Sequence, residues 1–292
     1  MPKTVVAIGE ALWDVFPDQR RAGGAPFNVA CHAARLGDRG VVITRVGDDP
    51  AGEELVAFLR GRGVVTDHVQ RDAARPTGTV SVTIEDSDPR YAIAEDVAWD
   101  YMTAEDAART LMRTADAICV GSLAQRREPS RATIRQLLSD ARGRALVVFD
   151  VNLRPPFIDS DVIEATFRVA DVVKMSESEV ARTSALLDRP SLIRWLLQSV
   201  GVRAVCVTRG KGGASITTRQ GTVSTPGVEV DTSTGDAVGA GDAFTAALAH
   251  RLVRNATPEE TLQAANGYAA LVATKKGAVP VLSSANLAAI GL

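Results

Sequence analysis

A glycine-lined turn carries an acidic residue near the C-terminal end of the chain, in the run Asp236-Ala237-Val238-Gly239-Ala240-Gly241-Asp242-Ala243-Phe244. Gly239 and Gly241 let the backbone approach a ligand closely, and the free amides at the start of the helix that follows would point at a negative group such as phosphate. Asp242 could then accept a proton from a hydroxyl that attacks this phosphate. A helix N-cap without catalytic activity produces the same pattern, because Asp and Gly are common at helix starts.

A second candidate site lies near the N-terminus, where Gly9-Glu10-Ala11-Leu12-Trp13-Asp14 follows an apolar run and Gly23-Gly24-Ala25-Pro26-Phe27-Asn28 leads into a helical segment. Ligands of parallel sheets bind where strands end. The two glycines permit close approach, and Asp14 and Asn28 offer the acceptors and donors that bind vicinal hydroxyls of a sugar. A turn followed by a helix with proline in its first turn explains the same residues without a ligand.

Continuous apolar runs alternate with helical patterns through most of the chain, which is typical of strands buried on both faces. The sequence therefore predicts an α/β fold with three layers, in which helices cover both sides of a mostly parallel sheet. The predicted strands are 5–8, 41–46, 117–120, 146–149, 172–175 and 204–208. The predicted helices are 26–36, 52–60, 104–113, 129–141, 191–199, 241–253 and 258–274.

One region lacks this pattern of continuous apolar runs and helices. Apolar and hydroxyl side chains alternate there in Thr79-Val80-Ser81-Val82-Thr83-Ile84. Such alternation predicts a half-exposed strand. With 11–16 and 91–94 it would form a small antiparallel sheet, a lid made by about 10–24 and 70–100 within a single domain of 1–292. Bare sheet edges are liabilities, so the lid also suggests a homodimer in which a second copy covers it.

Composition excludes several classes of function. The net charge of -2 and the pI near 6.0 leave no basic excess for nucleic acid. We find no apolar run long enough to cross a membrane and no signal segment, which favours a cytoplasmic protein. The three cysteines and three histidines lack the spacing of disulfide frameworks or zinc sites: Cys31, Cys119, Cys206, His32, His68 and His250.

The two glycine-rich runs, in this order and spacing, resemble the two signatures of the ribokinase-like (PfkB) carbohydrate kinases. The resemblance covers nearly the whole chain, through Val46-Gly47-Asp48-Asp49, Asp150-Val151-Asn152-Leu153-Arg154-Pro155, Thr208-Arg209-Gly210-Lys211-Gly212-Gly213 and Lys276-Gly277-Ala278. Within the family, the first signature, the segment around Arg154, and Glu95-Asp96-Val97-Ala98-Trp99-Asp100 look most like bacterial fructokinases.

The resemblance implies ATP and Mg²⁺ as cofactors, a sugar as substrate, and a role for each matching residue. Asp242 would be the general base, and Gly239, Ala240 and Gly241 would give amides to the transferred phosphoryl group. The helix start should lower the pKa of Asp242, leaving it a modest base that is ionised at neutral pH. The residues expected to hold the sugar are Asp14, Gly23, Gly24, Asn28 and Arg154.

The nucleotide and ions are assigned in the same way. The residues that would bind ATP are Ser176, Thr208, Arg209, Gly210, Gly213 and Asn266, with Lys211 as a further phosphate contact. Glu179 would reach magnesium through water, and Asp236 and Val238 would take part in a site for a monovalent cation such as K⁺. The chain departs from the family at Ser176, where Asn is usual and would offer more hydrogen bonds.

The sequence thus favours an ATP-dependent kinase that phosphorylates fructose at its 6-hydroxyl. Kinases for 2-keto-3-deoxygluconate, ribose or a nucleoside remain alternatives, and Arg154 could pair with the carboxylate of the keto acid. A sugar sensor without activity is less favoured because Asp242 and its glycines are intact. A dinucleotide-binding oxidoreductase would need Gly-x-Gly-x-x-Gly after the first strand, and the chain has none there.

Overall fold

The computed structural model describes residues 1–85, 88–288 and 290. The strands of its large sheet are β1 (Thr4–Ile8), β4 (Arg39–Gly47), β5 (Val69–Asp72), β8 (Ala117–Val120), β9 (Leu146–Asp150), β10 (Val172–Ser176), β11 (Ala204–Thr208), β12 (Ala214–Thr218) and β13 (Gly221–Thr225). Among the described residues these nine strands lie in the order β13-β12-β11-β10-β9-β8-β1-β4-β5. The pairs from β11 to β5 are parallel, and the β11–β12 and β12–β13 pairs are antiparallel.

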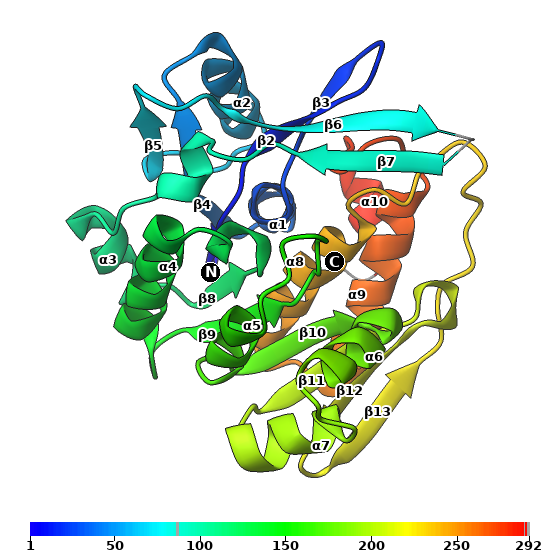
Figure 1. The fold of residues 1–292 in the computed structure, drawn as a ribbon. Helices are drawn as coiled ribbons and strands as arrows, with labels where there is room; N and C mark the ends of the chain where they lie inside the picture. The colour runs from blue at the N-terminus through cyan, green and yellow to red at the C-terminus, as the bar shows by residue number, and fades with distance from the viewer. Residues whose placement is uncertain (86–87, 289, 291–292) are drawn as a thin grey trace.

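Helices cover both faces of this sheet (Figure 1). One face carries α1 (Ala25–Arg35), α2 (Pro50–Gly61), α8 (Ala240–Leu252), α9 (Pro258–Ala273) and α10 (Ser284–Ala288). The other carries α3 (Asp106–Met112), α4 (Glu128–Ala141), α5 (Ser160–Phe167), α6 (Glu177–Leu186) and α7 (Leu192–Trp195), which continues into a π-helical turn. Within the described ranges, no helix combines the length and apolar character that a membrane span requires.

The apolar strands are buried on both sides, as their continuous composition predicts. In β1, Val6 and Ile8 join the core under α3 and α4, whereas Val5 and Ala7 join the core under α1 and α8. All four side chains have no exposed surface. Successive side chains of a strand point to opposite faces, so a strand between two helical layers must be apolar at every position. The predicted three-layer α/β fold is confirmed.

The second sheet comprises β3 (Arg20–Gly23), β2 (Leu12–Val15), β6 (Gly78–Glu85) and β7 (Asp88–Ile93), in that order. Val80 and Val82 are buried and Ser81 is exposed, as the alternation predicts; the side chains of Thr83 and Ile84, and residues 86–87 of the expected lid, lie outside the described part. The predicted small antiparallel sheet is confirmed, with one difference: its β2–β6 pair is parallel. Both strands leave the core in the same direction, so only β3 and β7, which return, run antiparallel to their neighbours.

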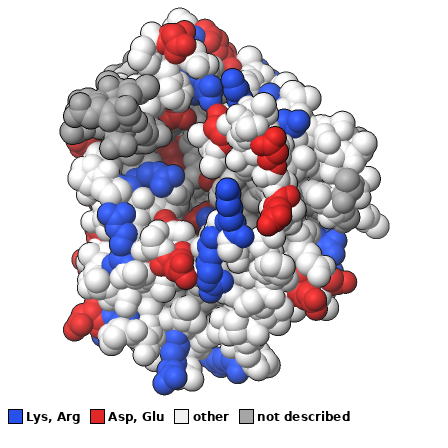
Figure 2. Space-filling view, turned by 90° about the vertical axis from the view of Figure 1, so that its right-hand side faces the viewer, with Lys and Arg blue, Asp and Glu red and all other residues white. Residues whose placement is uncertain are grey.

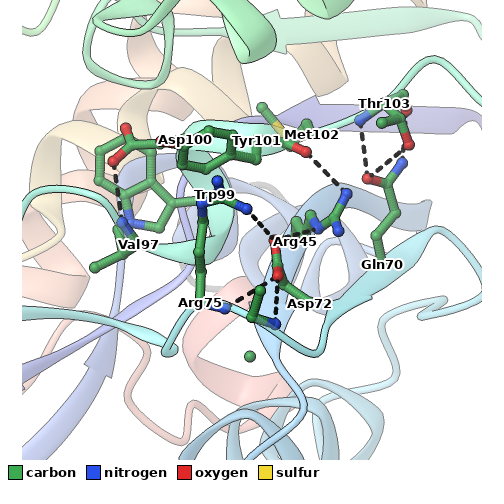
Figure 3. A network of polar contacts seen from close by, with 12 residues as sticks. Arg45, Gln70, Asp72, Arg75, Val97, Trp99, Asp100, Tyr101, Met102 and Thr103 are labelled. Carbon is green, nitrogen blue, oxygen red and sulfur yellow. Dashed lines mark hydrogen bonds and ion pairs between the residues drawn. The ribbon is translucent and has the colours of Figure 1, made fainter.

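A polar network fastens the segment that returns from this lid to the core (Figure 3). Arg45 of β4 pairs with Asp72 of β5 at 2.9 Å and donates to the carbonyl of Tyr101 at 2.9 Å. Gln70 of β5 exchanges hydrogen bonds with the backbone of Thr103 at 2.6 and 2.9 Å. The backbone that follows β7 is therefore held at several points, which gives the lid a fixed base.

The segment Glu95-Asp96-Val97-Ala98-Trp99-Asp100 belongs to this base. Trp99 and Asp100 are completely buried. Arg126 makes two 2.8 Å hydrogen bonds to the carboxylate of Asp100 and lies 4.0 Å from the centre of the Trp99 ring. A buried, doubly hydrogen-bonded ion pair costs several kcal/mol to break from one side, so these residues serve the stability of the lid base.

Candidate active site

Gly239 is the N-cap of helix α8, and its φ of 77° lies in the left-handed region that favours glycine. A Cβ there would come within 2.5 Å of the Cα and carbonyl oxygen of Ala278, so only glycine fits. The first hydrogen bond of the helix runs from the Ala243 amide to the Gly239 carbonyl, at 2.8 Å. The amides of Gly241 and Asp242 are therefore directed out of the helix end, whereas the Ala240 amide donates to the Ala237 carbonyl at 3.3 Å.

Asp242 and Asn28 meet at this helix end. The Asn28 side-chain amide donates to Asp242 Oδ2 at 2.7 Å, and Asn28 is buried whereas Asp242 is half-buried. Asn28 lies in the first turn of α1, and its remaining side-chain oxygen has no partner among the described residues. The two glycine-rich runs of the sequence thus form one site rather than two.

Burial raises the pKa of Asp242 to about 6, and the negative charge of Asp150 adds to this effect. The hydrogen bond from Asn28 and the charges of Lys174 and Arg154 act in the opposite direction. The expected lowering of this pKa by the helix start is therefore wrong in direction, because loss of water outweighs the helix amides. A pKa of about 6 leaves the carboxylate ionised at neutral pH and makes it a better base than predicted.

A buried ion pair lies directly beneath this helix start. Lys174 Nζ is 3.0 and 3.1 Å from the two carboxylate oxygens of Asp150, and both side chains are less than a tenth exposed. Thr245 donates to Asp150 Oδ2 at 2.7 Å and lies 3.0 Å from the Gly241 carbonyl. A Cβ on Gly241 would stand 3.5 Å from Lys174 Nζ, so the ammonium group borders the proposed anion site.

Glu10 is a third acidic group in the site. It follows β1, is 4% exposed, and accepts a hydrogen bond from the Ala25 amide at the start of α1, at 3.2 Å. Its second oxygen is buried and has no partner within the described residues. Burial is the main cause that raises its pKa to about 7; the charge of Asp242 acts in the same direction, and Arg154 opposes it.

Asp14 of β2 stands beside Gly23 of β3, where a Cβ would approach its Oδ2 to 2.6 Å. Gly24, with φ 107°, faces the Glu10 carbonyl, which a Cβ would meet at 2.4 Å. Burial raises the pKa of Asp14 to about 6 against the charges of Arg154 and Arg21. The charge of the exposed Arg154 lowers the pKa of three carboxylates, those of Glu10, Asp14 and Asp242.

A pocket of about 830 Å³ opens on the other side of the helix start. It is lined, among others, by Thr208, Gly210, Lys211, Gly213, Asp236, Ala240, Gly241 and Asn266. Asn266 is held in place because its side-chain amide donates to Thr225 Oγ1 at 2.8 Å and to the Pro226 carbonyl at 3.1 Å. The volume lies within the usual range for small-molecule sites. Most residues assigned to ATP from the sequence thus surround one pocket that ends at the proposed anion site.

Two residues assigned to ATP, Arg209 and Ser176, and the residue assigned to magnesium, Glu179, do not line this pocket. Arg209 donates to Ser215 at 3.0 Å and pairs with Glu177 at 3.4 Å. Ser176 and Glu179 form a capping box at the start of α6, with the Ser176 amide and hydroxyl 2.7 and 2.8 Å from Glu179 Oε2. The Leu153 amide donates to the other oxygen at 2.8 Å. Hydrogen bonds from the chain itself thus already occupy these side chains.

Asp236 and Val238, assigned to a monovalent cation, lie in the segment before α8. The Asp236 carboxylate accepts the Gly277 amide at 3.1 Å and pairs with Arg21 of β3 at 3.0 Å, whereas the Val238 side chain is exposed. Figure 2 shows this side of the molecule, hollowed near its centre, with acidic and basic side chains around the hollow. Because the guanidinium group of Arg21 contacts the Asp236 carboxylate, this carboxylate already has a positively charged partner.

Three further residues of the site were not predicted from the sequence: Glu10, Asp150 and Lys174. A signal for Lys174 and Asp150 exists, because each is a charged residue in or at the end of an apolar strand that must be buried on both faces. Glu10 follows the opening strand, at the edge where ligands of such sheets bind.

Comparisons with known proteins agree with this geometry. The model of the family described as "pfkB family carbohydrate kinase" matches residues 5–285. A fructokinase of Vibrio alginolyticus is 33% identical over 300 residues, covering 95% of this chain and 95% of that protein. The solved fructokinase of Xylella fastidiosa with bound ATP has a TM-score of 0.90 at 25% identity, covering 99% and 98% of the two chains. The aminoimidazole riboside kinase of Salmonella enterica, complexed with its riboside and an ATP analogue, has a TM-score of 0.83 at 25% identity and covers 98% and 99%.

Proposed function

The chain belongs to the pfkB family of carbohydrate kinases, and on this premise we propose that it transfers the γ-phosphoryl group of ATP to the 6-hydroxyl of fructose, with Asp242 as general base. The observation that carries the proposal is the junction of the two sites at Asp242, which Asn28 contacts from the sugar side at 2.7 Å while Gly241 borders the nucleotide pocket. A sugar hydroxyl and a terminal phosphate can meet there.

The residues divide the chemistry between them. Asp14, Asn28 and the glycines at 23 and 24 bind sugar hydroxyls, which orients the 6-hydroxyl toward Asp242. Asp242 accepts the hydroxyl proton as the oxygen attacks phosphorus and the bond to the leaving ADP oxygen breaks. The outward amides at the start of α8 stabilise the charge on the transferred group by about 3 kcal/mol per donor. Lys174 adds a positive charge that is shielded from water.

Glu179 could contact magnesium only through a water molecule of an ion that the nucleotide holds. Glu179 accepts three hydrogen bonds from the chain, so its carboxylate has about one of four acceptor positions left for a water molecule of the ion. When bound, magnesium would neutralise charge on the ATP phosphates. A monovalent cation fits Asp236 less well, because Arg21 already contacts that carboxylate.

Fructose is favoured by the 33% identical fructokinase, which this chain matches over 95% of its length. A riboside is the second candidate, favoured by the fold shared with the aminoimidazole riboside kinase. The keto acid has less support, because the three carboxylates around Arg154 already compensate its charge.

Two experiments test the proposal. An ADP-release assay with fructose, ribose, 2-keto-3-deoxygluconate and aminoimidazole riboside should show the highest kcat/KM for fructose, and no turnover on any of them would favour a sensor. The Asp242→Asn variant should lose roughly 100-fold or more in kcat while its ATP affinity changes only a few-fold. Asp106→Asn, which alters another first-turn Asp on the distant helix α3, is the matched control. Full activity of Asp242→Asn would remove this residue from the role of base.

A further inference from the structure

Two adjacent arginines of β3 make different ion pairs. Arg20 pairs with Glu54 of α2 at the surface and lies 4.5 Å from the centre of the Trp13 ring. Arg21, on the opposite face of the strand, reaches Asp236 with its Nη1 3.0 Å from the Oδ2 of that residue. Asp236 is 215 positions away in the chain and lines the nucleotide pocket. Arg21 therefore connects the lid to a segment on which the nucleotide site depends.

That segment, residues 226–239, has no regular secondary structure. It leaves β13 and runs along the right-hand side of the molecule to α8 (Figure 1). Among residues 227–237 of the described chain, Asp236 alone hydrogen-bonds to segments other than the adjoining α8: its amide donates to the Lys275 carbonyl at 3.0 Å, and its carboxylate accepts from Gly277 and Arg21. Asn266 holds the start of this segment at the Pro226 carbonyl, and Asp236 holds its other end.

The contacts continue to the anion site. Gly277 precedes Ala278, whose backbone packs so closely on Gly239 that no Cβ fits between them. Gly239 in turn caps the start of α8, where the free amides of the helix lie. At the other end, Arg21 acts on the sugar side, because its charge lowers the pKa of Asp14, which is paired with it in the β2–β3 register.

We propose that Arg21 is a positioning residue that couples the sugar site to the nucleotide site, because its ion pair with Asp236 fastens the segment before α8 to the lid strand beside Asp14. The inference rests on the proposed binding of sugar at Asp14 and of ATP in the pocket at Asp236. A sugar that orders β2 and β3 then also orders the anion site, so each ligand should bind more tightly when the other is present.

Arg21→Met and Arg20→Met form a matched pair that tests this coupling. Without ligand, hydrogen exchange of the amides in 231–241 and 275–278 should be roughly 2- to 5-fold faster in Arg21→Met than in the wild type, the range expected for a partly exposed ion pair. Arg20→Met should exchange as the wild type does. Equal exchange in the two variants over these segments would overturn the proposal.

The second measurement is the affinity for the non-hydrolysable analogue AMP-PNP with magnesium, with and without fructose. Fructose should tighten AMP-PNP binding in the wild type and in Arg20→Met, and this factor should fall to about one in Arg21→Met. In a double-mutant cycle, adding Asp236→Asn to Arg21→Met should not change the factor by which fructose tightens AMP-PNP binding. If the proposed function is wrong, the wild type will show no turnover on fructose. The hydrogen-exchange comparison of Arg21→Met with Arg20→Met does not depend on turnover, so it still decides the role of Arg21.

Discussion

Asn28 donates its side-chain amide to the carboxylate of Asp242 across 2.7 Å, although 214 positions separate the two residues in the chain. The hydrogen bond stabilises the ionised carboxylate and so lowers a pKa that burial raises to about 6. One side chain therefore connects the proposed sugar site with the protonation state of the proposed base.

Replacing Asn28 with Ala should change both properties. The pKa of Asp242 should rise, so the acidic limb of the kcat/KM profile should move to higher pH by about half a unit to one unit. The KM for the sugar should also rise, because a hydroxyl partner is lost. Initial rates from about pH 5 to pH 9 measure both effects. An acidic limb at its wild-type position would contradict the role of this hydrogen bond.

Replacing Glu10 with Gln should stabilise the protein at alkaline pH. Burial raises the pKa of Glu10 from 4.5 to about 7, so the native state holds this proton more tightly than the unfolded chain does. The stability contributed by the bound proton is present below about pH 4.5 and is lost as the pH rises through 7. Gln carries no such penalty and can still accept the Ala25 amide.

Urea unfolding should therefore show Glu10→Gln to be more stable than the wild type by on the order of 2 kcal/mol at pH 8, with the difference shrinking toward about pH 5. A difference that is the same at both pH values would show that Glu10 does not titrate in this range.

Replacing Lys174 with Met should destabilise the protein by about 3–5 kcal/mol, because Asp150 would remain buried without its cation. The double variant Lys174→Met, Asp150→Asn removes both charges and should regain most of this stability. Its kcat should still be lower by roughly 10-fold or more, because the positive charge at the anion site is missing. Urea unfolding and initial rates separate the two effects. Wild-type kcat in the double variant would assign the pair to stability alone.

Replacing Gly239 with Ala should impair turnover as well as stability. The new Cβ would meet the backbone of Ala278 and strain a φ of 77°. Gly143 is a matched control, since its φ is 72° and no atom lies within 4 Å of the position of its Cβ. Gly143→Ala should cost about 1–2 kcal/mol of stability with normal kcat, whereas Gly239→Ala should cost more and lower kcat. Thermal unfolding and initial rates test this contrast.

The layers of the fold follow from local patterns. Strands β8 and β11 coincide with the predicted ranges 117–120 and 204–208, because an apolar run between helical segments admits few other structures. Strand β3 was not predicted: Arg20-Arg21-Ala22-Gly23 has no apolar alternation, and it is a strand because β2 supplies its hydrogen bonds. The parallel β2–β6 pair depends in the same way on where the chain leaves the core.

The position of the candidate site could be predicted from its glycines, but the pKa values of its carboxylates could not, because they depend on burial. The spacing of Gly239, Gly241 and Asp242 indicates a helix start with a base, and the structure brings Asn28 to the same point. The upward shift of the Asp242 pKa could not be predicted, because it depends on the water removed by residues distant in sequence. The Arg21–Asp236 pair is of the same kind, since neither residue has a local pattern that indicates the other.

Helix α1 packs against α8, so an early and a late helix of the chain are neighbours in the folded protein. During translation, the apolar side chains of α1, such as Phe27 and Val29, leave the ribosome long before α8 exists to cover them. The nascent chain must keep this surface from aggregating until α8 has emerged. A ribosome that stalls before α8 therefore releases a product that has neither Asp242, the proposed base, nor the covering helix.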